Sequence, residues 1–169
     1  MTSWSIRPER PEDVAAIRDV TLEAFRNAPF SDQHEADIVD ALRAGGALSV
    51  SLVAFRDEEI LGHIAFSPVE IGGEKGDWYG LGPIAVRPSH QGQGLGQALV
   101  WAGLDQLAVL GASGCVLQGA PAFYGRFGFE SDPELYYGEG PSPYFQRQIL
   151  AGPPASGEVR YHAAFGEAD

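Results

Sequence analysis

The segment from Ile84 to Leu99 constrains the fold more than any other part of the chain. It begins with a short apolar run, Ile84-Ala85-Val86, which Pro88 brings to an end. A glycine-rich stretch follows, Gln91-Gly92-Gln93-Gly94-Leu95-Gly96, and leads into an apolar helix pattern. A turn of this kind exposes unpaired backbone N–H groups at the positive end of a helix dipole, where an anion binds well. We therefore predict that this segment binds a phosphorylated cofactor.

Length and composition predict a single domain over residues 1–169, with a core at about 3–150 and a C-terminal tail at 151–169. The chain has 169 residues, of which 44% are hydrophobic, too many for a disordered chain. No segment approaches the ~20 consecutive apolar residues of a membrane helix, and the first residues lack the features of a signal peptide. The net charge of −12 argues against a nucleic-acid partner. We expect a cytoplasmic protein with neither a membrane nor a nucleic-acid partner.

The acidic charge and the lone cysteine narrow the chemistry further. Acidic surfaces attract cationic amines, although they also serve general solubility. Cys115 is the only cysteine, which excludes an internal disulfide and a cysteine-based metal cluster. It lies in an apolar run, where a small buried side chain is expected rather than a nucleophile. We expect no metal site.

The hydrophobic pattern alternates between strand and helix periods and predicts an α/β fold. Gly80, Gly82 and Pro83 interrupt the strand that precedes the glycine-rich turn, and such residues suggest a bulge or a place where neighbouring strands part. The strand, long helix and strand between residues 78 and 118 form a crossover that makes neighbouring strands parallel. We expect a mixed central sheet of about six to seven strands. The expected strands are 5–8, 48–55, 60–66, 78–86, 114–118, one that starts at residues 127–129, 144–150 and a tail strand within 159–165, and a loop is expected over 131–143. The expected helices are 11–27, 32–44, 94–110 and a brief one from residue 121. The helix over 94–110 is apolar nearly all round, so most of it should be buried except for one polar stripe of Gln97, Trp101 and Asp105.

Three kinds of phosphate-binding loop compete for the glycine-rich turn. A P-loop requires Gly-Lys-Ser/Thr, but Leu95-Gly96-Gln97 follows here and supplies neither the lysine nor the hydroxyl. A dinucleotide fold places its loop after the first strand, with an acidic residue about 20 positions further on. Gly111-Ala112-Ser113 stands at that distance instead. A loop that binds coenzyme A is the third kind.

The third alternative is supported by a resemblance to a known family. Gln91-x-x-Gly94-x-Gly96, following Val86-x-Pro88, resembles the signature of the GNAT superfamily of acyl-CoA-dependent N-acyltransferases. The stretch from Phe123 to Phe129, Phe-Tyr-Gly-Arg-Phe-Gly-Phe, resembles the second hallmark of that superfamily. The resemblance covers roughly residues 3–150 and is closest to the YhbS-like subgroup of predicted N-acetyltransferases.

The resemblance implies a single GNAT-like domain with helices on both faces of a sheet that splays between its fourth and fifth strands. It also implies acetyl-CoA as the acyl donor, with its pantetheine arm against the backbone of Ile84, Ala85 and Val86. The pyrophosphate is expected on the turn and the first residues of the helix: Gln91, Gly92, Gln93, Gly94, Leu95, Gly96 and Gln97.

The same resemblance makes Tyr124 the expected catalytic residue. Its hydroxyl would donate a proton to the leaving thiolate; the alternative is a tyrosine that only packs against neighbouring aromatic rings. Glu70, Asp77 and His63 are candidates for a general base, and the family does not always need one. Many relatives carry an asparagine after the strand that follows the long helix, whereas Gln118-Gly119 stands here.

These observations predict an N-acetyltransferase that acts on a small-molecule amine or a peptide amine within a ternary complex. The alternative is a non-catalytic module that binds acyl-CoA as a sensor or interaction domain. Trp101, on the one polar stripe of the long helix, fits either a contact in a homodimer or a tryptophan beneath the tail. Neither the acceptor nor the length of the acyl chain follows from the residues.

Overall fold

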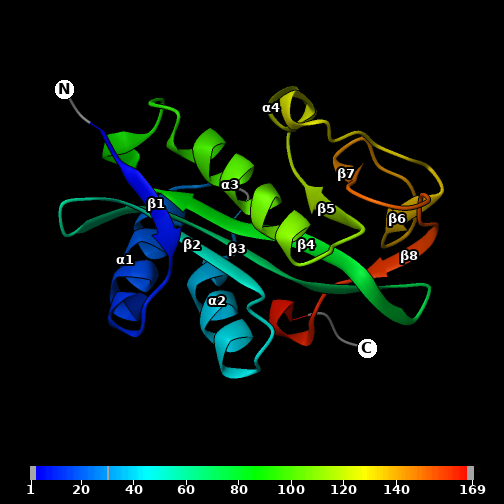
Figure 1. The fold of residues 1–169 in the computed structure, drawn as a ribbon, viewed down its shortest axis with the longest axis horizontal. Helices are drawn as coiled ribbons and strands as arrows, with labels where there is room; N and C mark the ends of the chain where they lie inside the picture. The colour runs from blue at the N-terminus through cyan, green and yellow to red at the C-terminus, as the bar shows by residue number, and fades with distance from the viewer. Residues whose placement is uncertain (1–2, 30, 167–169) are drawn as a thin grey trace. The chain divides into compact units, whose positions relative to one another are not determined.

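The computed structural model describes residues 3–29 and 31–166 (Figure 1), and the chain divides into two compact units. Unit 1 comprises Met1–Phe66 and Gly82–Gln106, and unit 2 comprises Ser67–Leu81 and Leu107–Asp169. Strands β3 (Glu59–Ile71) and β4 (Glu74–Val86) and helix α3 (Leu95–Val109) contribute residues to both units. The elements are β1 (Ser5–Pro8), η1 (Pro11–Asp13), α1 (Val14–Phe25), α2 (Glu35–Ala44), β2 (Val50–Arg56), β3 (Glu59–Ile71), β4 (Glu74–Val86), η2 (Pro88–His90), α3 (Leu95–Val109), β5 (Gly114–Gln118), α4 (Pro121–Tyr124), η3 (Gly125–Phe127), β6 (Leu135–Tyr137), β7 (Phe145–Ile149), β8 (Gly157–Arg160) and η4 (Ala163–Phe165).

Unit 1 has helices on both faces of its strands. β1, β2 and β3 pair antiparallel, so residues opposite one another, such as Val53 and His63, share a face. Val53 belongs to a buried cluster with residues of α1 and α2, which places these two helices on that face (Figure 1). Gly62 and Phe66 point to the other face, where Phe66 contacts Gly103 of α3.

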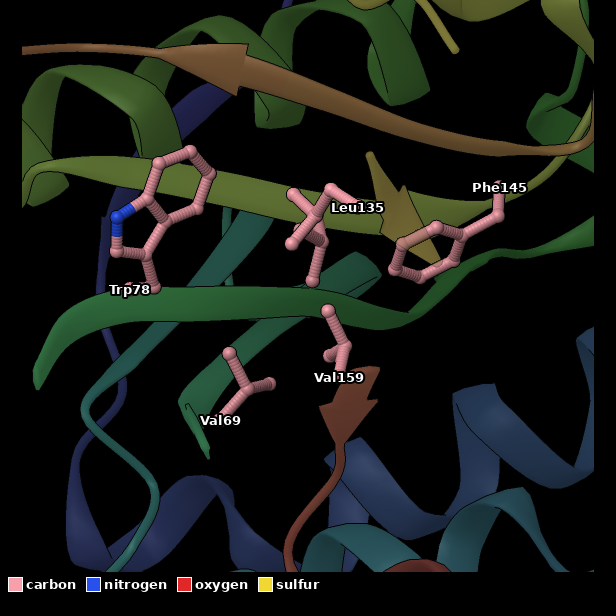
Figure 2. Close-up of a cluster of buried hydrophobic side chains, with 6 residues drawn as sticks. Val69, Trp78, Leu135, Phe145 and Val159 are labelled. Atoms are coloured by element: carbon pink, nitrogen blue, oxygen red, sulfur yellow. The ribbon is translucent and has the colours of Figure 1, made fainter. Parts of the chain in front are cut away.

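Unit 2 is built around β5, which pairs parallel with β4 and antiparallel with β7. The β4–β5 ladder covers only Trp78–Gly80 and Gly114–Val116. β8 pairs with both β3 and β6 and so joins the tail to the sheet. The core of this unit is a buried cluster drawn from six different strands (Figure 2): Val69, Trp78, Val116, Leu135, Phe145 and Val159.

The expected fold class is confirmed as a mixed α/β fold with an open sheet of eight strands in the order β1-β2-β3-β4-β5-β7, with β8 on β3 and β6 on β8. β4 and β5 share only three residue pairs, as the expected splay requires. β5 has the bounds that the sequence predicted, and α4 begins at the predicted residue, Pro121. Among the described residues, no helix combines the length and apolar character needed to cross a bilayer.

Several local expectations were wrong. α2 begins at Glu35 rather than residue 32, because Asp32 accepts a hydrogen bond from the His34 N–H in a turn before the helix. Phe129 does not begin a strand: Glu130 forms an isolated bridge to Arg147, and β6 forms later, within the expected loop. The polar stripe of α3 is exposed as expected at Gln97, Trp101 and Asp105, but the rest of the helix is less buried than expected, since Val109 is 79% exposed.

Candidate active site

The end of β4 presents alternate backbone groups to its two sides. The Arg87 N–H donates to the Leu61 carbonyl oxygen on β3 at 2.9 Å. Backbone groups alternate along a strand, so those of Ile84 and Val86 face away from β3. The Val86 carbonyl oxygen accepts a hydrogen bond from Gln91 Nε2 at 3.1 Å. The side chain of Gln91 therefore ties the glycine-rich turn to the edge of the strand that was predicted to hold the pantetheine arm.

The turn itself depends on glycine at two positions. Gly92 and Gly94 have φ angles of +79° and +89°, a left-handed conformation that other residues adopt only at a cost. The Ala98 N–H donates to the Gly94 carbonyl oxygen at 3.0 Å, closing the first turn of α3. The N–H groups of Leu95 and Gly96 come before this bond, where a helix has no acceptor of its own.

Gly96 differs from the two turn glycines because neither its backbone nor its neighbours require it. A Cβ built there would lie 3.9 Å from Val86 Cγ2, an ordinary contact. Protein packing therefore leaves room above Gly96. That room is what the close approach of a phosphate to the helix start would use.

The predicted cofactor residues all lie in unit 1, and two of them have buried side chains. Leu95 is 1% exposed and Ala85 2% exposed, so both pack inward. Gln91, Gly92, Gln93, Gly94 and Gln97 are exposed, and Ile84, Val86 and Gly96 are half-buried.

Tyr124 lies in unit 2, in the last turn of the short helix α4. Its ring makes edge-on contacts with Phe123 and Phe129, at centroid distances of 4.9 and 6.1 Å. Burial raises the pKa of the Tyr124 hydroxyl, and the nearby Cys115 thiol raises it further. The phenol is therefore protonated at neutral pH, the state that an acid needs before it donates.

Gly119 is a positioning residue that the sequence analysis did not identify. A Cβ at this position would lie 2.4 Å from Tyr124 Cε2, so the ring occupies the space that only glycine leaves. The buried Gln146 holds this glycine in place, because its Nε2 donates to the Gly119 carbonyl oxygen at 3.1 Å. No motif marks this contact, since Gly119 and Gln146 lie 27 positions apart. Gln118, considered a substitute for the asparagine of relatives, is exposed.

Of the three candidate bases, His63 lies in a buried polar network. Its Nε2 is 2.8 Å from Ser51 Oγ, and that hydroxyl donates to Glu9 Oε1 at 2.5 Å. Burial lowers the pKa of His63 to about 4, so its imidazole is neutral at pH 7 and a weak base. Glu70 is half-buried on β3, where it pairs in register with Arg160 on β8, and Asp77 is exposed on β4.

The expected burial of Cys115 is confirmed. Its side chain is 0% exposed, and burial raises the pKa of the thiol. A thiol held in its neutral form is a poor nucleophile, so Cys115 serves packing.

Comparisons with known proteins find relatives across the region that contains the glycine-rich turn and Tyr124. Residues 14–129 match the model of the acetyltransferase (GNAT) family. A GNAT family acetyltransferase from Brucella melitensis, solved in complex with acetyl-CoA, is 50% identical, with 96% of this chain and 98% of that one covered and a TM-score of 0.86. YhbS from Escherichia coli, solved in complex with CoA, is 37% identical, with 97% and 92% covered and a TM-score of 0.85. By sequence alone, the protein named uncharacterized N-acetyltransferase YhbS of E. coli K12 is 43% identical over 126 residues, which are 74% of this chain and 72% of that protein.

Proposed function

The chain belongs to the acetyltransferase (GNAT) family, and on this premise we propose that it transfers an acetyl group from acetyl-CoA to a primary amine. The transfer proceeds by direct attack of the amine within a ternary complex. When bound, acetyl-CoA supplies an already activated thioester. The protein then has to bind the donor, orient it and provide a proton.

The observation that carries this proposal is the geometry of the turn between β4 and α3. Gly94 holds the left-handed conformation, the space above Gly96 is open, and the helix presents unpaired N–H groups there. We assign the pyrophosphate to residues 91–97. The backbone groups of Ile84 and Val86, which face away from β3, are assigned to the amides of the pantetheine arm.

We assign the proton donor to Tyr124. Its raised pKa keeps the phenol protonated, and the contact with Gly119 restricts the ring. A general base drawn from His63 is disfavoured, because its imidazole is buried and engaged with Ser51. Glu70 and Asp77 stay candidates for the base. Without a base, the amine arrives already deprotonated or loses its proton to water.

Thiol release from acetyl-CoA in the presence of an amine panel tests this function. The panel contains small primary amines, amino acids and peptides with free amino groups, and longer acyl-CoA donors run in parallel. Acceptor-dependent release with an acetylated product supports the proposal. Tight binding of acetyl-CoA without release under any amine would support the sensor instead, and no binding would contradict both functions.

A further inference from the structure

Arg56 and His90 form a side-chain pair beside the glycine-rich turn that the assignments above do not use. Arg56 ends β2, and His90 ends η2, directly before Gln91 of the turn. Arg56 Nη2 lies 2.9 Å from His90 Nε2 although the residues are 34 positions apart. An arginine only donates, so Nε2 is the acceptor, and the Nδ1–H of His90 donates to Ser89 Oγ at 2.9 Å. His90 thus accepts from the guanidinium and holds it in place.

The glycine-rich turn itself contains no cation that could bind the charged ribose phosphate of coenzyme A. Residues 88–109 include no lysine and no arginine. Backbone N–H groups suit the pyrophosphate, but coenzyme A also carries a phosphomonoester on its ribose, with a charge of about −1.5 to −2 at pH 7 as for other phosphomonoesters. Because the chain carries a net charge of −12, favourable binding of this charged phosphate calls for a positively charged side chain close to it.

Arg56 meets this need better than the other arginine near the turn. The charge of Arg87 is already balanced by two carboxylates. Its Nη1 lies 3.0 Å from Glu23 Oε1, and its Nε lies 3.9 Å from Glu59 Oε2. Glu59 is opposite Arg56 in the β2–β3 hairpin, yet its carboxylate lies toward Arg87. Within residues 3–29 and 31–166, no carboxylate oxygen comes within 4.0 Å of the Arg56 guanidinium, which donates to the imidazole nitrogen of His90 instead.

We propose that Arg56, positioned by His90, binds the ribose 3′-phosphate of coenzyme A. The planar guanidinium donates paired hydrogen bonds to a phosphomonoester, a geometry that lysine cannot reproduce. Two kinds of hydrogen-bond donor would then bind coenzyme A. Backbone N–H groups of the turn would bind the pyrophosphate, and the Arg56 guanidinium would bind the ribose 3′-phosphate. This inference rests on the proposed function, since it presumes that coenzyme A is the ligand.

Titration calorimetry with CoA and 3′-dephospho-CoA, which lacks only that phosphate, tests the proposal. The wild-type protein should bind CoA about tenfold or more tightly than 3′-dephospho-CoA, as expected for a charge-assisted hydrogen bond. Arg56→Gln should lower the affinity for CoA to that for 3′-dephospho-CoA and leave the latter unchanged. His90→Leu should reduce the same preference by a smaller factor. Arg160→Gln, an equal change of charge at an exposed arginine of β8, should match the wild type.

The outcomes separate this subsite from the proposed function. Equal losses for both ligands in Arg56→Gln, or no loss for either, would overturn the assignment of Arg56. A wild-type protein that binds both ligands equally would overturn it as well, while coenzyme A binding itself would stand. If the folded wild-type protein binds neither ligand, the proposed function fails with it.

Discussion

At the scale of single residues, Tyr124 is where the proposed chemistry is most directly testable. Tyr124→Phe removes only the hydroxyl and keeps the edge-on ring contacts with Phe123 and Phe129. We expect kcat to fall about 100-fold or more, the usual contribution of a general acid, with KM for acetyl-CoA and the melting temperature unchanged. Steady-state assays of thiol release measure this. Unchanged turnover would leave Tyr124 a packing residue only.

Gly119 should affect turnover through Tyr124 alone. Gly119→Ala places a Cβ 2.4 Å from the ring edge, and we expect the displaced hydroxyl to lower kcat about 100-fold. Gly125→Ala is the matched control, because Gly125 has a helical φ of −57° and open space around it. In a Tyr124→Phe background, Gly119→Ala should lower turnover no further. An additional loss in that background would show that Gly119 acts independently of the tyrosine.

His63 makes stability depend on pH in a defined window. Its pKa is about 4 in the folded protein, against 6.5 for an unperturbed histidine, because burial disfavours the charged ring. Between these values the unfolded chain binds more protons, so lowering the pH through 6.5 reduces the free energy of unfolding. We expect a loss of about 2 kcal/mol between pH 7 and pH 5.

Urea unfolding at a series of pH values measures that slope. His63→Gln should flatten it, whereas His34→Gln, at an exposed histidine, should preserve it. A slope that His63→Gln does not alter would mean that His63 has a nearly unperturbed pKa when folded.

At the scale of elements, the seating of α3 on β3 depends on one glycine. A Cβ at Gly103 would lie 2.2 Å from Phe66 Cε1. Although alanine favours helix by ~1 kcal/mol, we expect Gly103→Ala to destabilise the protein by about 1–3 kcal/mol through overpacking. Thermal or urea unfolding measures this, with Gly76→Ala as a control in open space. A second change, Phe66→Leu, should recover part of the loss; greater stability in the single variant would refute the tight contact.

The elements around the candidate site differ in how far the sequence predicted them. β5 and the start of α4 were placed correctly, because glycine and proline mark their ends through local backbone preferences. The polar stripe of α3, Gln97, Trp101 and Asp105, was also predicted correctly. The exposure of Val109 was not, because an apolar residue type does not determine whether a neighbour covers it. β6 was missed, since a three-residue strand exists only through its pairing with β8.

At the scale of the whole molecule, the tail is part of a core rather than an appendage. Val159 on β8 is 1% exposed within the cluster of unit 2 (Figure 2), beside Val69 and Trp78. We expect Val159→Ala to cost about 2 kcal/mol, and removal of residues 151–169 to cost more, because β8 also pairs with β3 and β6. Chemical denaturation measures both. Glu158→Ala, an exposed neighbour, should be neutral, and a stable truncated chain would contradict the assignment of the tail to the core.

The strand, the glycine-rich turn, the helix that follows and the family were all predictable from the order of the residues. Glycine and proline act through local backbone geometry, and the spacing of Gly94 and Gly96 is readable within one short segment. The contacts between distant residues became visible only in the folded chain: Gly119 against the ring of Tyr124, Ser51 against His63, and Arg56 against His90. Burial, a shifted pKa and a paired side chain depend on atoms that folding brings together from distant positions. A linear pattern does not contain those distances.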